Sequence, residues 1–366
     1  MQLETLRAEK FRNLEGEMVF SPGLNILTGE NGQGKTNWLE AIDVLATTRS
    51  WRTSRLPEAV KFGETEAFVA GRVRESPEIA REMRVVIKGN TKTLAINDKK
   101  EVVGRYLGQL HAELFSHDEL DIVRGMPDAR RRYLDGGIVA LYPPFVQVLS
   151  DYGRVIKQKN ALLQRARDEE YSLDKTREAL IPWNEQLIKL ADKIHRARIR
   201  FVERVNEVLE KHLFSREELS IRYVSSLEGK GELSDYAGLI AERLDLRVQA
   251  ELSAGYSLIG PHRDDLELTF DGHDLRKYGS AGQQRSALIL LKLANISVYN
   301  ATRGEYPLFL IDDIDAELDY KRIGKLLEFL TDKTQTFVTT SKESFVQKFG
   351  AHAVIFHVTN GAAQMQ

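Results

Sequence analysis

The chain of 366 residues contains 42% hydrophobic and 29% charged residues, has a formal net charge of −2 and lacks cysteine. The lack of cysteine excludes disulfides and thiolate metal sites, which suits a reducing cytoplasm. No apolar run approaches the length of a membrane span and the first residues lack a signal-peptide core, so we expect a cytoplasmic protein without a membrane partner.

Residues 1 to about 115 are predicted to be rich in strands. Short apolar or alternating runs bounded by turn residues predict strands at 14–20, 24–27, 68–73, 83–87 and 93–96. Because turns rather than helices join these runs, we expect an antiparallel sheet beside the loop that follows the second run.

That loop reads Gly29-Glu30-Asn31-Gly32-Gln33-Gly34-Lys35-Thr36, and an apolar helical pattern begins at Trp38. It matches the phosphate-binding loop, in which glycines let backbone N–H groups converge on phosphate oxygens at a helix N-terminus. Lys35 would reach the β- and γ-phosphates, and Thr36 would ligate Mg²⁺. The alternative is that a glycine-rich turn matches this pattern by chance. A strand pattern directly before the loop and a helical pattern directly after it disfavour that alternative. We therefore predict nucleotide binding.

From about residue 116 the pattern becomes helical. Pro143 is predicted to start one long helix and Pro182 another, after a polar break near Ser172. Apolar residues of the second helix fall seven apart, as in a coiled coil, at Leu187, Ile194, Phe201 and Val208. We expect two antiparallel helices that pack on each other and form a short arm.

Beyond residue 215 strands are predicted again, at 219–224 and 266–270, with the polar loop 259–266 before the second. In the last segment, helices at 283–300 and 321–330 alternate with strands at 308–311, 336–340 and 354–358. This alternation predicts a mainly parallel sheet with crossover helices.

Asp312 and Asp313 follow the predicted strand at 308–311 directly. P-loop ATPases hold Mg²⁺ with an aspartate in this position, so we assign that role to Asp312. Asp313 would lie beside the γ-phosphate, where a carboxylate can orient or deprotonate the attacking water. A helix cap or a turn is the commoner explanation of such a pair when it occurs alone.

Ser280, Gly282 and Gln283 precede a helix that is apolar nearly all round, and a short acidic loop follows Asp313 at 316–319. The helix start could be a simple N-cap or an anion site. The order of nucleotide loop, Ser-x-Gly-Gln, Asp-Asp and Glu-Leu-Asp resembles the ATP-binding-cassette arrangement. In that superfamily the Ser-Gly-Gln segment of one subunit closes over the γ-phosphate held by the other.

Within that superfamily the chain resembles the RecF family of bacterial recombinational-repair ATPases. The resemblance runs from the N-terminus to about Ser341 and includes 11–14, 22–25, 32–37, 49–52, 123–135, 259–265, 279–285 and 317–319. It departs from the family pattern at Trp38, Thr47-Thr48, His117 and Ala316. The resemblance implies an α/β fold, with an ABC-type ATPase head flanked by an antiparallel sheet and an inserted, mainly helical lobe.

The resemblance also implies the domain boundaries, the ligands and the partners. One lobe would comprise 1–115 and 300–366, with the helical lobe at 116–299 inserted between them. ATP and Mg²⁺ are the implied ligands, with further nucleotide contacts by Arg12 and Asn37, slow hydrolysis by Asp313 with Lys35, and an ATP-dependent homodimer. RecF-like proteins act with RecO and RecR to load RecA at single-strand gaps beside duplex DNA.

Because the net charge is close to zero, DNA binding would need a local cationic patch. Arg49, Arg52 and Arg55 follow the nucleotide helix and are our candidates for DNA contact; a solvated charged surface is the alternative. Two other functions compete. One is the nucleotide-binding subunit of a transporter, and the other is a nucleotide-gated scaffold that does not need hydrolysis.

Overall fold

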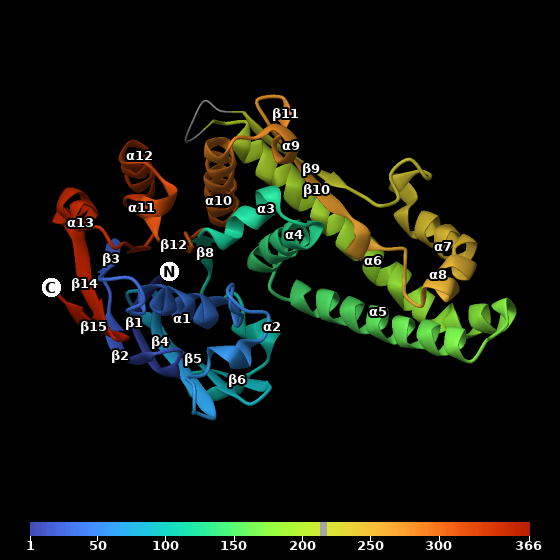
Figure 1. Cartoon of the computed structure of the whole chain (residues 1–366), viewed down its shortest axis with the longest axis horizontal. Coiled ribbons are helices and arrows are strands. Elements are labelled where there is room, and N and C mark those ends of the chain that lie inside the picture. Colours follow the sequence, from blue (N-terminus) through green and yellow to red (C-terminus); the bar gives the residue numbers. More distant parts are fainter. Residues whose placement is uncertain (213–217) are drawn as a thin grey trace.

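Strands from both ends of the chain lie together, and a helical arm extends away from them (Figure 1). The computed structural model describes residues 1–212 and 218–366. Within this part, the strands form two six-stranded sheets and one three-stranded sheet. The N-terminal and C-terminal segments, blue and red in Figure 1, are neighbours, so that both ends of the chain contribute to one half of the molecule.

The first six-stranded sheet is antiparallel, as the sequence predicts, with the order β2-β1-β4-β5-β6-β7. The sequence pattern does not predict β1, because register shifts between Leu3 and Thr5 and between Glu9 and Phe11 interrupt its alternation. The strands are β1 (Gln2–Phe11), β2 (Leu14–Val19), β4 (Glu66–Ser76), β5 (Ile79–Lys88), β6 (Thr91–Ile96) and β7 (Lys99–Glu101).

The second six-stranded sheet has the order β15-β14-β3-β13-β12-β8, and only β15 runs antiparallel to its neighbour. The predicted parallel sheet is thus confirmed, and the run at 24–27 belongs to it rather than to the antiparallel sheet. The strands are β3 (Leu24–Thr28), β8 (Ala112–Phe115), β12 (Leu308–Ile311), β13 (Thr336–Thr339), β14 (Ala353–Thr359) and β15 (Ala362–Met365).

Helix α1 (Lys35–Thr47) lies between these two sheets and contacts strands of both. Most of its residues are buried, so its apolar side chains fill the core on more than one side. On the other side of the parallel sheet, α10 (Ala281–Arg303), α12 (Tyr320–Leu330) and α13 (Glu343–Phe349) contribute to a second core. Helix α1 is therefore the central element that the two sheets share.

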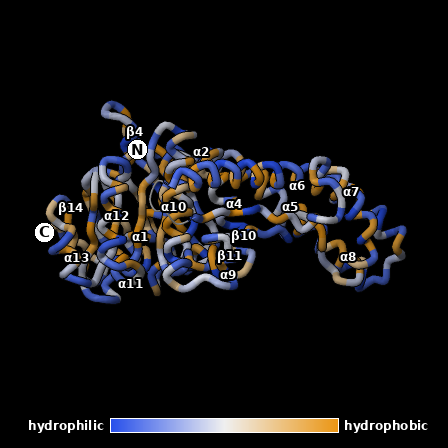
Figure 2. The backbone as a smooth tube through the Cα atoms, turned by 90° about the horizontal axis from the view of Figure 1, so that it is seen from above, coloured by the Kyte–Doolittle hydropathy of each residue, from blue (hydrophilic) through white to orange (hydrophobic). Residues whose placement is uncertain are grey.

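The helical arm consists of two long antiparallel helices, α5 (Phe145–Asp168) and α6 (Leu173–Leu209). Their packing confirms the predicted arm, and apolar and polar stretches alternate along both helices in Figure 2. The predicted start of the second helix at Pro182 is wrong, because Ser172 caps the helix and Pro182 lies inside it on the exposed side. Leu180, buried against Leu163, extends the packing upstream of the proline.

The remaining helices and strands lie around the two six-stranded sheets or along the arm, where α7 and α8 contact the arm helices. They are α2 (Val103–Tyr106), α3 (Asp121–Arg124), α4 (Pro127–Leu141), α7 (Tyr236–Leu246), α8 (Val248–Ala254), α9 (Leu275–Tyr278), α11 (Ile314–Glu317), β9 (Leu219–Val224), β10 (Asp265–Phe270) and β11 (His273–Asp274). Short 3₁₀ turns lie at Leu56–Ala59, Asp118–Leu120, Leu233–Asp235, Pro261–Arg263 and Gly350–His352.

The polar loop before β10 joins several elements at the base of the arm. Arg130 of α4 donates to both carboxylate oxygens of Asp265, at 2.6 and 3.0 Å. Arg198 of α6 donates to both oxygens of Asp135 and to the carbonyl of Pro261. Both guanidinium groups are nearly buried, so these bidentate pairs fix the angle between the helices and the loop.

Farther along the arm, a buried ion pair joins α5 to α8. The Nζ of Lys159 lies 2.7 Å from Oε2 of Glu251, and both side chains are fully buried. Oε1 of Glu251 accepts hydrogen bonds from the backbone N–H of Leu258 and the hydroxyl of Ser257. The carboxylate thus has several partners, whereas Glu251 is the one carboxylate that pairs with Lys159 among the residues that the structure describes.

We predict that Lys159→Met destabilises the protein by about 3–5 kcal/mol, because it leaves the Glu251 carboxylate buried without a cation. Urea unfolding followed by circular dichroism measures the change. Lys157→Met, an exposed position on the same helix, is the matched control and should change stability by less than about 0.5 kcal/mol. Equal midpoints for the two variants would show that the pair is not important for stability.

Candidate nucleotide-binding site

The glycine-rich loop connects β3 to α1, in the position that the sequence predicts. Gly29 needs its lack of a side chain, since a Cβ there would lie 2.5 Å from the carbonyl oxygen of Val358. Gly34, with φ of 111°, is the N-cap of α1, and a Cβ there would lie 2.8 Å from the side chain of Asn13. The loop is therefore held closely against two other segments of the chain.

Lys35 is the first residue of α1, and its side chain turns back into the loop. Its Nζ donates to the carbonyl oxygens of Gly29 at 2.7 Å and Glu30 at 2.8 Å. Burial lowers the pKa of Lys35, although the carboxylates of Asp313, Asp312 and Asp315 act in the opposite direction. A buried ammonium group whose hydrogen bonds go to two neutral carbonyl oxygens suits a phosphate, which would add charge-assisted hydrogen bonds.

Thr36 and Asp312 come together across 276 positions of sequence, and Oγ1 of Thr36 donates to Oδ1 of Asp312 at 2.9 Å. The same oxygen accepts from Oγ1 of Thr339, at the end of β13, at 2.7 Å. Burial raises the pKa of Asp312 despite these two hydrogen bonds. A hydroxyl and a buried carboxylate at this spacing fit Mg²⁺, which prefers hard oxygen ligands and few protein ligands.

Asp313 has a left-handed backbone, with φ of 51°, and its N–H donates to Oγ1 of Thr339 at 2.7 Å. A residue other than glycine in this region marks a constrained position. Burial lowers the pKa of Lys35, and the charge of Asp313 is the largest of the effects that oppose this lowering, so the two predicted catalytic residues lie close enough to interact. In the acidic loop Asp319 caps α12, while the side chains of Ala316 and Glu317 lie outside the described residues.

Two segments that the sequence analysis does not assign to the site also hold the loop. The Asn360–Gly361 turn donates its two N–H groups to Gln33, to Oε1 and to the backbone oxygen, at 2.7 Å each. Asn13 donates to the same backbone oxygen at 3.3 Å. Asn-Gly between strands is a hairpin signal, so the turn is detectable in sequence although its contact with the loop is not.

Trp38 explains how the C-terminal hairpin is attached. Its Nε1 donates to the carbonyl oxygen of Gly361 at 3.0 Å, and the ring is buried. A leucine, which the resemblance leads us to expect at this position, cannot donate that hydrogen bond. The departure from the family pattern therefore links α1 to the last hairpin of this chain.

Arg12 and Asn37, for which the resemblance implies nucleotide contacts, bond protein groups around the start of α1. Arg12 donates to both carboxylate oxygens of Glu40, at 3.0 and 2.7 Å, and to the carbonyl of Glu58. Asn37 bonds the side chains of Asn13 and Arg52. Both residues stabilise the first turns of α1, and their contact with a nucleotide stays a prediction.

The three candidate DNA-binding arginines differ in their surroundings. Arg52 lies 3.1 Å from Oε2 of buried Glu40, and Arg55 lies 3.7 Å from Glu58. Arg49 is exposed and lies at the C-terminal end of α1. Four cations of β4 and β5 in the antiparallel sheet are paired with carboxylates, in the contacts Arg72–Glu4, Arg74–Glu4, Arg84–Asp98 and Lys88–Glu66.

Ser280 is the N-cap of α10, in a capping box with Gln283. Oγ of Ser280 accepts from the N–H of Gln283 at 3.2 Å, and Oε1 of Gln283 accepts from the N–H of Ser280 at 2.9 Å. Ser280 is exposed, and Gly282 follows, partly exposed, in the first turn. The simple N-cap is thus present, on a surface that a second molecule can reach.

Within the described residues, none of the helices has both the length and the apolar character that crossing a bilayer requires.

Comparisons with known proteins place this geometry in a family. Residues 2–364 match the model of the RecF/RecN/SMC N terminal domain. The DNA replication and repair protein RecF of Staphylococcus carnosus (strain TM300) is 36% identical over 374 residues, covering 99% of each chain. The recombination mediator protein RecF, solved as RecF-ATPrS, is 30% identical with a TM-score of 0.89, covering 100% of this chain and 98% of that one.

An SMC head solved with the C-winged helix domain of ScpA has the same fold, with a TM-score of 0.55 at 15% identity, covering 100% of this chain and 97% of that one. The predicted ABC-type α/β head is therefore confirmed. Because the family model spans nearly the whole chain and a relative above 30% identity aligns end to end, this protein belongs to the RecF/RecN/SMC family, among its RecF members.

Proposed function

We propose that this protein is an ATP hydrolase that dimerises when ATP is bound and acts as a slow switch in the repair of gapped DNA. The observation that carries the proposal is the contact of Thr36 with Asp312, which places a hydroxyl and a buried carboxylate beside the phosphate-binding loop. The relatives named DNA replication and repair protein RecF support the repair role. A solved relative named RecF-ATP supports ATP as the nucleotide.

In this proposal, the backbone N–H groups of 29–36 and the ammonium group of Lys35 hold the phosphates of ATP. Thr36 and Asp312 would hold Mg²⁺, which supplies charge neutralisation on the phosphate oxygens. Asp313 orients the attacking water or takes its proton. Its left-handed backbone, directly after β12, supports a constrained role for this position.

The exposed start of α10 supplies the second half of the site in a dimer. Ser280, Gly282 and Gln283 of one subunit would close over the γ-phosphate held by the other, using the positive end of the helix and a hydroxyl. ADP lacks that phosphate, so hydrolysis would release the dimer. The helix start would then have different roles in the two states, as an intrahelical cap and as a phosphate contact.

The proposal also includes the division of the chain and its partners. Residues 1–115 and 300–366 would form one lobe around the two six-stranded sheets, and 116–299 the inserted lobe. DNA at single-strand/double-strand junctions, RecO and RecR are the proposed partners, and the cytoplasm is the proposed location. A nucleotide-gated scaffold would differ only in not needing hydrolysis, which the Asp313 variant below distinguishes.

Lys35→Ala should abolish ATP binding, whereas Asp313→Asn should bind ATP and stop its turnover. Lys35 contacts phosphates in the ground state, while Asp313 acts mainly on the attacking water. Titration with a fluorescent ATP analogue and a phosphate-release assay measure the two steps, with Lys157→Ala as a surface control. If Asp313→Asn hydrolyses ATP at the wild-type rate, Asp313 is not catalytic. If the variant does not hydrolyse ATP but functions normally in cells, the protein is better described as a nucleotide-gated scaffold that does not need hydrolysis.

Ser280→Arg should leave a folded monomer that still binds ATP, because the larger cationic side chain fills the space of the γ-phosphate. Light scattering with ATP, with ADP and without nucleotide measures the mass of the wild type and the variant. The control is Lys277→Arg, which changes an exposed side chain three positions before Ser280. This variant should dimerise with ATP. An ATP-independent dimer, or a Ser280→Arg variant that dimerises normally, would contradict the capping role.

ATP-bound protein should bind duplex DNA more tightly than the protein without nucleotide, with affinity that falls as salt rises. Arg49→Glu with Arg55→Glu should weaken binding and reduce the salt slope by about 1 for each phosphate that is no longer neutralised. Arg52 is left unchanged because it holds Glu40. The control is the double variant Arg196→Glu with Arg200→Glu, which makes the same charge change at two exposed positions of α6, outside the proposed patch. Equal affinities for the two double variants at matched salt would exclude the proposed patch.

A further inference from the structure

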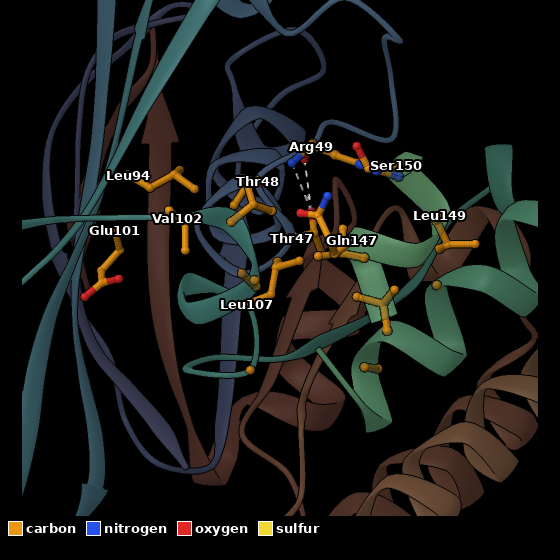
Figure 3. Close-up of a pocket in the computed structure, with 18 of the residues that line it drawn as sticks. Thr47, Thr48, Arg49, Leu94, Glu101, Val102, Leu107, Gln147, Leu149 and Ser150 are labelled. Carbon is orange, nitrogen blue, oxygen red and sulfur yellow. Dashed lines mark hydrogen bonds between the residues drawn. The ribbon is translucent and has the colours of Figure 1, made fainter. Parts of the chain in front are cut away.

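A cavity of about 980 Å³ lies at the opposite end of α1 from the nucleotide-binding loop. The C-terminal end of α1, the strand β6 and the segment 100–111 form one side of it, and the helices α4 and α5 form the other. In Figure 3, Leu94, Val102 and Leu107 lie on one side and Gln147, Leu149 and Ser150 on the other, with Thr48 and Arg49 near them. The cavity is thus formed jointly by the sheet region and the inserted helices.

The walls of the cavity combine aliphatic side chains with cations. The aliphatic part includes Leu94, Val102, Leu107, Val139 and Leu149. Arg49, Lys92, Lys100 and Arg132 supply four positive charges, against the carboxylates of Glu101 and Asp135. The Asp135 carboxylate is already occupied, because both of its oxygens accept from Arg198. The cavity lining therefore has more positive than negative charge that is available to a ligand.

These cations lack carboxylate partners within the described part of the chain. No ion pair among the described residues includes Arg49, Lys100 or Arg132, although most other arginines of the sheet region are paired. Arg130 and Arg131, the neighbours of Arg132 in the sequence, bond Asp265 and the carbonyl of Asp264. Of the three consecutive arginines, Arg130 and Arg131 thus bond other groups of the protein, whereas Arg132 lines the cavity.

The surroundings of Lys92 also show that the cations of this cavity lack negatively charged partners among the described residues. Its Nζ donates to the carbonyl oxygen of Thr48 at 2.6 Å and to Oγ1 of Thr48 at 2.8 Å, both neutral acceptors. Burial lowers the pKa of Lys92 to about 8, and the charge of Arg49 acts in the same direction. A ligand carboxylate in the cavity would offset both effects.

We propose that this cavity binds an acidic peptide segment of a partner protein, with aliphatic side chains against its walls and carboxylates on Arg49, Lys92, Lys100 and Arg132. Carboxylates form strong charge-assisted hydrogen bonds with arginine and lysine. A cavity of this size can enclose one or two apolar side chains of an extended segment. The lining contains neither Phe, Tyr nor Trp, whereas single-stranded nucleic acids bind by stacking bases on such residues.

Gly136 provides a variant that fills the cavity, since its position has room for a side chain. It lies on α4 in the cavity lining, and a Cβ built there meets no other atom within 4 Å. Gly136→Phe therefore fills the space with an aromatic ring and replaces a poor helix former. Gly153 of α5 has equally free space and does not line the cavity, so Gly153→Phe is the matched control. Arg132→Glu tests the charge separately.

The probe is a fluorescein-labelled decapeptide of Leu, Asp and Glu, titrated against the full-length protein and followed by fluorescence anisotropy. The wild type and Gly153→Phe should bind it equally. Gly136→Phe and Arg132→Glu should each bind at least ten times more weakly. A peptide with Asn and Gln in place of the acidic residues should bind at least ten times more weakly than the acidic one, and salt should weaken the acidic peptide's binding.

Three outcomes would overturn the proposal. They are equal binding of the acidic and neutral peptides, equal binding by Gly136→Phe and Gly153→Phe, and binding of a ten-nucleotide oligothymidine that matches the acidic peptide and is abolished in Gly136→Phe. The last outcome would assign the cavity to nucleic acid. ATP binding and urea midpoints measured on the same samples separate a blocked cavity from a damaged nucleotide site or an unfolded protein.

Discussion

The contact of Thr36 with Asp312 depends on the order of strands in the parallel sheet. Strand β13 pairs with β3 on one side and with β12 on the other, so that it separates the strand before the phosphate-binding loop from the strand before Asp312. Thr339 at the end of β13 contacts both sides, since its backbone pairs with Leu27 of β3 while its hydroxyl donates to Asp312 and accepts from the N–H of Asp313. The site therefore forms only when both ends of the chain have joined one sheet.

Buried charges connect this site to the helix that starts at Ser280. Lys292 of α10 lies 2.6 Å from Glu119 and 3.5 Å from Glu113, and these carboxylates raise the pKa of Lys292 although burial alone would lower it. On α1, burial raises the pKa of Asp43 well above its usual range, with Glu119 and Glu40 acting in the same direction. A displacement of α10 on closure of a dimer would therefore disturb charges that act on the nucleotide helix.

The sequence predicts the loop, the aspartate pair and most strands, because each of these signals is contained in a few consecutive residues. It does not predict β1, where bulges break the alternation, or the start of α6, where burial of Leu180 outweighs Pro182. The support of the loop by Asn13 and Gly361 depends on contacts between distant segments. The pairing of Arg12 with Glu40, 28 positions away, is likewise a contact that the sequence alone does not predict.

The distribution of arginines limits how one protomer can attract DNA. On strands β4 and β5 of the antiparallel sheet, Arg72 and Arg74 share Glu4, Arg84 contacts Glu82 and Asp98, and Lys88 contacts Glu66, so that four carboxylates offset these four cations. The exposed cations near α1 are few, and a few phosphate contacts give weak, strongly salt-dependent binding. Association of two protomers would double those contacts on one molecule of DNA, and the two sets would bind as linked sites. Nucleotide-dependent dimerisation would then raise DNA affinity without any change in the surface of either protomer.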